Sequence, residues 1–168
     1  MKFTEFFPTE LDREVGRSRA VLAQVPEGHY GWKPHDKSMI FGYLASMVAT
    51  IPTWITMQIT QPELDIAPAA PKVPQARLKT SAQLIDALDK AASAARAAFA
   101  ETTDEHLATP WRLLQKTKVV MEAPRYEMIQ DTFNHWAHHR GQMTVYLRLL
   151  GATVPATFGP SADENQFR

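Results

Sequence analysis

The sequence predicts an all-α protein, a four-helix bundle with a long crossover loop between the second and third helices. Four stretches carry apolar residues at helical spacing, whereas strand-like alternation is weak and confined to one short segment. Residues 61–79 contain four prolines and no helical period, which is typical of a long connection. At 168 residues and without internal repeats, the chain is expected to form one domain, residues 1–168.

The first half of the chain predicts two helices. The first is expected over residues 9–24, with Thr9 as its N-cap. The second is expected over residues 38–60, with Ser38 as its cap and a bend at Pro52, because proline cannot donate the backbone hydrogen bond of a helix interior.

The second half predicts two more helices and some short elements. Thr80 begins a capping box, and the helix after it is expected to end near Glu101. Residues 103–107 predict a short extra turn, and residues 111–121 fit either a small hairpin or an extended connection. The last helix is expected over residues 124–150, since proline is favoured at a first helical position and a glycine follows the end.

Apolar residues of the last helix indicate which of its faces is buried. Phe133, Trp136, Met143 and Leu147 share one face and are expected in the core. Residues 39–59 are uncharged and long enough to span a bilayer. A stripe of hydroxyl side chains and a modest aliphatic density indicate a buried bundle helix instead, so no membrane span is expected.

Composition excludes several classes of function. Lys and Arg together number 18, equal to Asp and Glu, so the net charge is zero and nothing favours binding to nucleic acid. The chain has no cysteine, which excludes thiolate catalysis, thiolate metal sites and disulfides. The N-terminal residues lack the features of a signal peptide, so a cytoplasmic protein is expected.

Histidines of the last helix form the strongest candidate site. His135 and His139 are four residues apart, so on a helix they lie one turn apart on one face, the spacing by which a helix offers two imidazoles to one metal ion. Alternatively, both are partly buried histidines that bond to neighbouring side chains without a metal. Because two ligands are too few for a tight site, a third must come from elsewhere. The candidates are His29, His35, His106 and Asp131.

Three segments resemble one known family. They are residues 134–143 with their continuation to Gly151, residues 25–39, and residues 154–164, and together they resemble the DinB/YfiT-like proteins over essentially the whole chain. The resemblance implies a four-helix bundle, commonly dimeric, with a divalent metal on three histidines, one from the second helix and two from the last. The better-understood relatives are thiol-dependent transferases and isomerases that act with low-molecular-weight thiols.

The resemblance assigns roles to individual residues. His135 and His139 match the two metal ligands of the last helix, while Met47 stands where the third histidine is usual. A thioether is a soft, weak ligand, so zinc or nickel is expected to bind weakly or not at all. Gln142 and Tyr146 lie on the same stripe and are candidates to line a substrate pocket.

Two functions follow as hypotheses. The first is a metal-dependent enzyme related to thiol-dependent transferases, in which the metal lowers the pKa of a bound thiol or water. The second is a non-catalytic bundle that binds a small ligand or a partner without a tightly bound metal. Homodimerisation is also expected, since the uncharged second helix offers more apolar surface than one buried stripe needs.

Overall fold

The computed structural model describes residues 2–67 and 78–165, which form six helices and three strands. In chain order they are α1 (Phe3–Leu22), α2 (Phe41–Thr50), α3 (Pro52–Thr60), β1 (Glu63–Asp65), α4 (Ser81–Glu101), α5 (Asp104–Leu107), β2 (Pro110–Gln115), β3 (Lys118–Pro124) and α6 (Arg125–Leu149).

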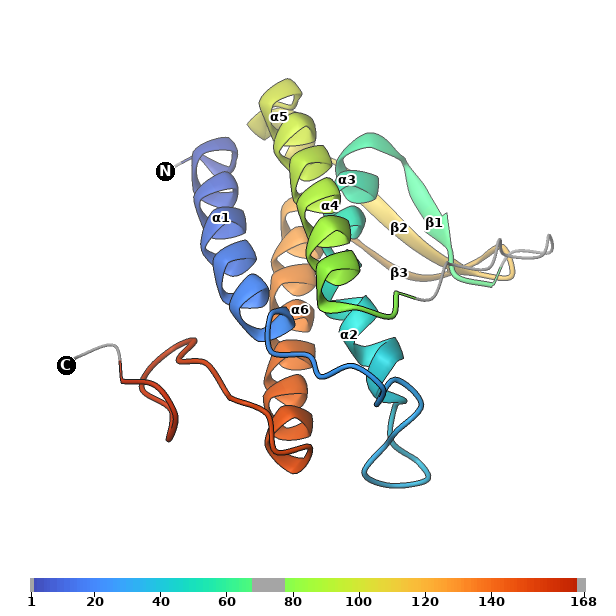
Figure 1. The fold of residues 1–168 in the computed structure, drawn as a ribbon. Helices are drawn as coiled ribbons and strands as arrows, with labels where there is room; N and C mark the ends of the chain where they lie inside the picture. The colour runs from blue at the N-terminus through green and yellow to red at the C-terminus, as the bar shows by residue number, and fades with distance from the viewer. Residues whose placement is uncertain (1, 68–77, 166–168) are drawn as a thin grey trace.

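The protein is mostly helical, as the sequence predicts. The helices α1, α4 and α6 and the α2–α3 pair lie around a common core, and a small sheet extends to one side of α3 and the first half of α6 (Figure 1). The predicted core residues of α6 are confirmed, because none of their side chains is more than 4% exposed. They are Phe133, Trp136, Met143 and Leu147. The indole Nε1 of Trp136 also donates a hydrogen bond of 2.8 Å to the carbonyl of Val48 in α2.

The three-stranded sheet corrects the all-α prediction. Of the two alternatives for residues 111–121, the hairpin forms: β2 and β3 are antiparallel, and β1 pairs with β2 in parallel. Lys116 and Thr117 at the turn both have positive φ angles, 51° and 67°, as in a type I′ turn. Their backbone N–H groups donate to the carboxylate of Asp65. No local sequence pattern indicates this contact, because it joins segments that are far apart in the sequence.

The predicted crossover loop, residues 61–79, is only partly described. Its first part contains β1, which the sequence does not predict, and residues 68–77 lie outside the described residues. β1 has only three residues, too few for periodicity to show.

Helix α1 begins at Phe3, so the predicted cap at Thr9 is wrong. Asp104, at the start of α5, accepts hydrogen bonds from the backbone N–H groups of Phe3 and Thr4, at 3.1 and 2.9 Å. These bonds, those from Thr4 above all, lower the pKa of the Asp104 carboxyl. The cap thus comes from a side chain about a hundred residues away in the sequence.

The predicted second helix is divided. Ser38 does not cap it; its N–H donates to the carbonyl of His35, and α2 begins at Phe41. Pro52 takes the first position of α3, after Ile51, where its missing N–H removes no helical bond.

The predicted cap at Thr80 is confirmed, and the predicted extra turn has a cap that the sequence did not predict. The Thr80 hydroxyl accepts a hydrogen bond from the N–H of Gln83 at the start of α4, and the Thr103 hydroxyl accepts one from the N–H of His106 at the start of α5. The predicted extra turn is therefore α5, a helix of four residues.

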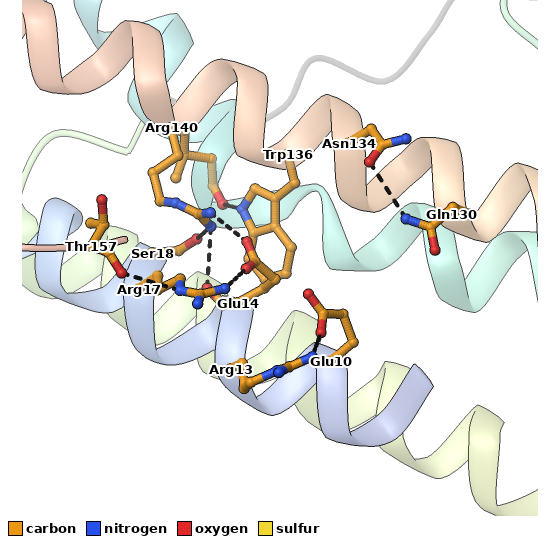
Figure 2. Close-up of polar contacts among 11 residues, drawn as sticks. Glu10, Arg13, Glu14, Arg17, Ser18, Gln130, Asn134, Trp136, Arg140 and Thr157 are labelled. Carbon is orange, nitrogen blue, oxygen red and sulfur yellow. Dashed lines mark hydrogen bonds and ion pairs between the residues drawn. The ribbon is translucent and has the colours of Figure 1, made fainter. Parts of the chain in front are cut away.

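A buried polar cluster joins α1 to α6 (Figure 2). Arg140, 1% exposed, forms an ion pair with Glu14, which is 3% exposed, and donates to the Ser18 hydroxyl at 3.1 Å. Arg17 forms a second ion pair with Glu14. Burial lowers the pKa of the Arg140 guanidinium, and the negative charge of Glu14 opposes that shift. Because the charges are paired across two helices, the cluster fixes the position of α1 against α6.

Within the described ranges, 2–67 and 78–165, no helix is long and apolar enough to cross a membrane.

Candidate functional site

Helix α6 brings His135 and His139 together, as their spacing predicts. Their Nε2 atoms lie 2.9 Å apart, and their rings meet edge to face with centroids 4.4 Å apart. His139 is buried, at 3% exposure, whereas His135 lies on the outer side of the pair. The pair therefore lies on the border between the core and the surface.

A chain of hydrogen bonds fixes which nitrogens carry protons. The amide oxygen of Gln142, 2.9 Å from Nδ1 of His139, can only accept, so this Nδ1 is the donor. In a neutral imidazole the other nitrogen is then an acceptor, so Nε2 of His139 accepts from Nε2–H of His135. This leaves Nδ1 of His135 as a lone-pair acceptor.

The surroundings of His135 keep it neutral at pH 7. Its pKa is lowered from the ordinary value of 6.5, first by burial and then by the neighbouring imidazoles of His139 and His138. A neutral ring is required for Nδ1 of His135 to accept a hydrogen bond, since a doubly protonated imidazole cannot accept.

His135 lies in the wall of a pocket of about 240 Å³ between α3, the sheet and α6. We call it the sheet-side pocket. Its wall is mainly apolar and aromatic, and Asp131 and His135 lie on its α6 side. The indole of Trp54 lies 5.2 Å from the His135 ring, centroid to centroid. The lining residues are Trp54, Met57, Gln58, Leu64, Ile66, Trp111, Leu113, Met128, Asp131, Thr132 and His135.

Trp111 is a residue of this pocket whose buried polar group lacks a hydrogen-bond partner. Its side chain is 2% exposed, and its indole Nε1 has no hydrogen-bond partner among the described residues. Leaving a buried donor unpaired costs about 1–3 kcal/mol. A ligand that supplies an acceptor to this N–H would remove the cost.

The wall formed by α3 and α6 is held by buried polar contacts. Gln58 and Thr132 exchange side-chain hydrogen bonds, with 2.9 Å from the Gln58 amide nitrogen to the Thr132 hydroxyl. The guanidinium of Arg125 donates to the backbone carbonyls of Gln58 and Gln61 near the end of α3, and burial lowers its pKa. Sequence reasoning missed these residues, because no local pattern indicates that α3 and α6 meet here.

Tyr146, predicted to line a substrate pocket, packs near the start of α2. Its hydroxyl donates to the carbonyl of Met39 at 3.2 Å, and its ring packs against Trp32 and Phe41. It is not among the residues that line the sheet-side pocket. Gln142 contacts His139 directly, so of these two candidates Gln142 belongs to the histidine cluster.

The candidates for a third metal ligand do not join the pair. His106 uses its Nε2 on the carbonyl of Ile59, at 2.8 Å, and His29 and His35 lie on an exposed loop. Across residues 2–67 and 78–165, no group of three histidine, aspartate or glutamate side chains is placed to hold a metal ion. The available donors, two imidazoles with the carboxylate of Asp131 nearby in the pocket wall, therefore do not fit a tight three-residue site.

Comparison with known proteins places the chain in a family. The sequence profile of the DinB family matches residues 8–166, nearly the whole chain. The chain belongs to the DinB family.

Two solved structures share its fold. A DinB-like protein from Bacillus cereus ATCC 10987 is similar with a TM-score of 0.70 and 22% identity, covering 92% of this chain and 97% of that one. A DinB-like protein from Bacillus subtilis, YjoA, is similar with a TM-score of 0.66 and 16% identity, covering 88% and 94%. At these identities the likeness shows the fold.

A curated relative matches over a short segment. It is the uncharacterized protein YrdA of Bacillus subtilis strain 168, 42% identical over 43 residues. The match spans 26% of this chain and 26% of that protein.

Proposed function

We propose that this DinB-family protein binds a small, mostly apolar molecule carrying a hydroxyl group in the sheet-side pocket. The observation that carries the proposal is the buried, unpaired indole N–H of Trp111 in the same pocket wall as His135. The Trp111 N–H lacks an acceptor, and Nδ1 of His135 can accept from a donor. A hydroxyl is both donor and acceptor, so the hydroxyl of a ligand can bond to either group.

The size and lining of the pocket support a small ligand. Sites for drug-sized molecules have volumes of roughly 300–1,000 Å³, so a pocket of about 240 Å³ suits a molecule of about one ring. Two tryptophans and several aliphatic side chains supply the apolar contact, while few polar groups give orientation. This is the non-catalytic alternative among the two functions that the sequence suggests.

The test uses p-cresol and p-xylene, which differ by a hydroxyl in place of a methyl group. NMR titration should show p-cresol shifting the indole signals of Trp54 and Trp111, with about tenfold tighter binding than p-xylene, since an unmatched polar site rejects the analogue. Trp111→Phe and His135→Phe should each reduce that preference. Leu113→Trp should fill the pocket and prevent binding, whereas Val120→Trp at an exposed position of β3 should not. Equal binding of both probes to the unaltered protein would refute the proposal.

The metal-dependent enzyme related to thiol-dependent transferases is the second candidate. It is supported by the short distance, 2.9 Å, between the Nε2 atoms of His135 and His139. Two nitrogens that each lie about 2.0–2.1 Å from the same metal ion are separated by roughly this distance. The hydrogen bond from His139 to Gln142 is of the kind that orients a metal-bound imidazole. The donor set is incomplete, so we expect zinc or nickel to bind weakly.

We also propose that the four helical segments, with α2 and α3 counted as one, form a four-helix bundle that assembles as a homodimer. Four apolar residues at the start of α2 and the end of α6 support this, because each is about half exposed and α2 packs against α6. They are Ile40, Tyr43, Val145 and Leu149. Light scattering at micromolar concentration should give the mass of a dimer, and Tyr43→Lys with Val145→Lys should give the mass of a monomer.

A further inference from the structure

A second pocket, of about 350 Å³, lies where the first turns of α1 and α6 meet. We call it the N-terminal pocket. It has an aromatic wall, formed chiefly by Phe3, Phe6 and Tyr126, and a polar rim on α6, formed by Glu127, Gln130 and Asp131. The histidine pair is not part of it. Neither the proposed function nor the histidine site uses this wall.

The aromatic wall is made of stacked and tilted rings. Phe3 and Tyr126 stack with centroids 4.5 Å apart and an interplanar angle of 6°, and Phe6 is tilted by 59° against Phe7 behind it. The face of an aromatic ring carries negative electrostatic potential and attracts a cation within about 6 Å of its centroid. Any ring face of this wall that a ligand reaches therefore favours a cation over an anion.

The wall is held in place without a ligand. Asp104 caps the first turn of α1 through Phe3 and Thr4, and the Thr4 hydroxyl adds a 2.7 Å bond to the same carboxylate. Phe3 is thereby fixed at its backbone, and Phe7 behind it packs against Phe99 and Phe133 of the core. A pocket formed before binding loses little conformational entropy when it is filled.

The charges of the rim complement the aromatic wall. Glu127 and Asp131 are one helical turn apart, so both lie on the face of α6 that borders the pocket. Glu127 accepts a hydrogen bond from the Tyr126 hydroxyl, while none of the described residues bonds to Asp131. Lys2 is the basic residue of the rim, and its Nζ lies 4.0 Å from the Glu5 carboxylate, which offsets its charge. The rim is therefore negative overall.

We propose that the N-terminal pocket binds an organic ammonium ion attached to a small apolar or aromatic group. The apolar group packs against Phe3, Phe6 and Tyr126, and the ammonium group lies between the ring faces and the carboxylates of Glu127 and Asp131. Cation–π attraction and carboxylate pairing act on the same charge, which is why the ligand is a cation.

The test compares three probes of one size: 3-phenylpropylamine, 3-phenylpropan-1-ol and 3-phenylpropanoate. NMR titration at pH 7 should show the amine, which is protonated, shifting signals of Phe3, Tyr126 and Gln130. It should bind about tenfold more tightly than the alcohol, and the carboxylate should bind least. Binding of the alcohol or the carboxylate as tight as that of the amine, or no binding of the amine at millimolar concentration, would overturn the proposal.

Variants separate this pocket from the sheet-side pocket. Glu127→Gln with Asp131→Asn should remove the preference for the amine, and Gln130→Glu should strengthen amine binding a few fold by adding a carboxylate. Glu122→Gln, an exposed carboxylate on β3, is the matched control and should have no effect. Leu113 lines the sheet-side pocket and not the N-terminal pocket, so Leu113→Trp should leave amine binding intact whether or not it prevents binding of p-cresol. The two proposals can therefore fail independently of each other.

Discussion

His139 and Arg140 are neighbours on α6 and both are buried, yet their polar groups are satisfied in different ways. Arg140 bonds to Glu14 and Ser18, side chains of another helix, so its bonds hold two helices together. His139 bonds to Gln142 and His135 on its own helix, and the chain of bonds ends at a free nitrogen in a pocket wall. A polar cluster of the first kind stabilises the fold, whereas one of the second kind is available to a ligand.

The two sides of α6 also differ in how they are covered. On the arginine side the chain after α6 returns, so that Arg17 donates to the carbonyl of Thr157 at 3.2 Å and the Phe158 ring lies 4.2 Å from the Arg17 guanidinium. On the histidine side the cover is α3 and the small sheet, which leave the sheet-side pocket between them. The covering segment, and not α6 itself, decides which side is closed.

The largest expected effect comes from breaking the closed cluster. Arg140→Met should lower the free energy of unfolding by about 3 kcal/mol, because Glu14 would stay buried with Arg17 as its remaining partner. Denaturant unfolding measures this. Arg148→Met, which removes an exposed ion pair with Asp163, is the control and should cost less than about 1 kcal/mol.

The double variant Glu14→Leu with Arg140→Met sharpens the same prediction. It should recover part of the lost stability, since no uncompensated charge is then buried. Equal or greater loss in the double variant would mean that packing, and not charge pairing, makes Arg140 important.

The next effect concerns metal affinity on the open side. Met47→His should raise zinc or nickel affinity at least tenfold by supplying the third imidazole that the family resemblance implies. His139→Ala in that background should abolish the gain. Calorimetric titration of the three proteins, purified without an affinity tag, measures it. If the unaltered protein already binds as tightly as Met47→His, another residue completes the site.

A smaller effect is expected from deleting the buried imidazole. His139→Ala should lower the free energy of unfolding by about 1–2 kcal/mol, less than Arg140→Met, since its hydrogen bonds stay within one helix. Thermal and denaturant unfolding side by side with Arg140→Met test the difference. A loss as large as that of Arg140→Met would remove the distinction between the two clusters.

The smallest effect is a pH dependence carried by His135. Because its pKa is lowered in the folded state, the unfolded state binds more protons near the ordinary value of 6.5. Its contribution to stability is therefore complete above pH 6.5 and is lost as the pH falls through the folded pKa. Unfolding between pH 7.5 and 5 in the presence of a chelator should show this slope, and His135→Ala should reduce it. A slope of the opposite sign would show that the folded protein favours the charged ring.

Local patterns in the sequence determine the helices of the core and the pairing of the histidines. A spacing of four residues is close to one helical turn, so His135 and His139 must share a face wherever α6 lies. The caps at Thr80 and Thr103 are likewise local, since each side chain bonds a backbone group three residues away. The buried face of α6 follows from the same period.

Tertiary structure alone decides what surrounds these elements. Asp104 caps the start of α1, Asp65 accepts hydrogen bonds from the hairpin turn, and Glu14 neutralises the buried charge of Arg140. In each case the partner lies dozens of residues away in the sequence or more. Both pockets exist because separate segments meet: α3, the sheet and α6 at one, α1 and α6 at the other. Helical periodicity tells which side of a helix is apolar but not which segment covers it, because that is settled by long-range packing.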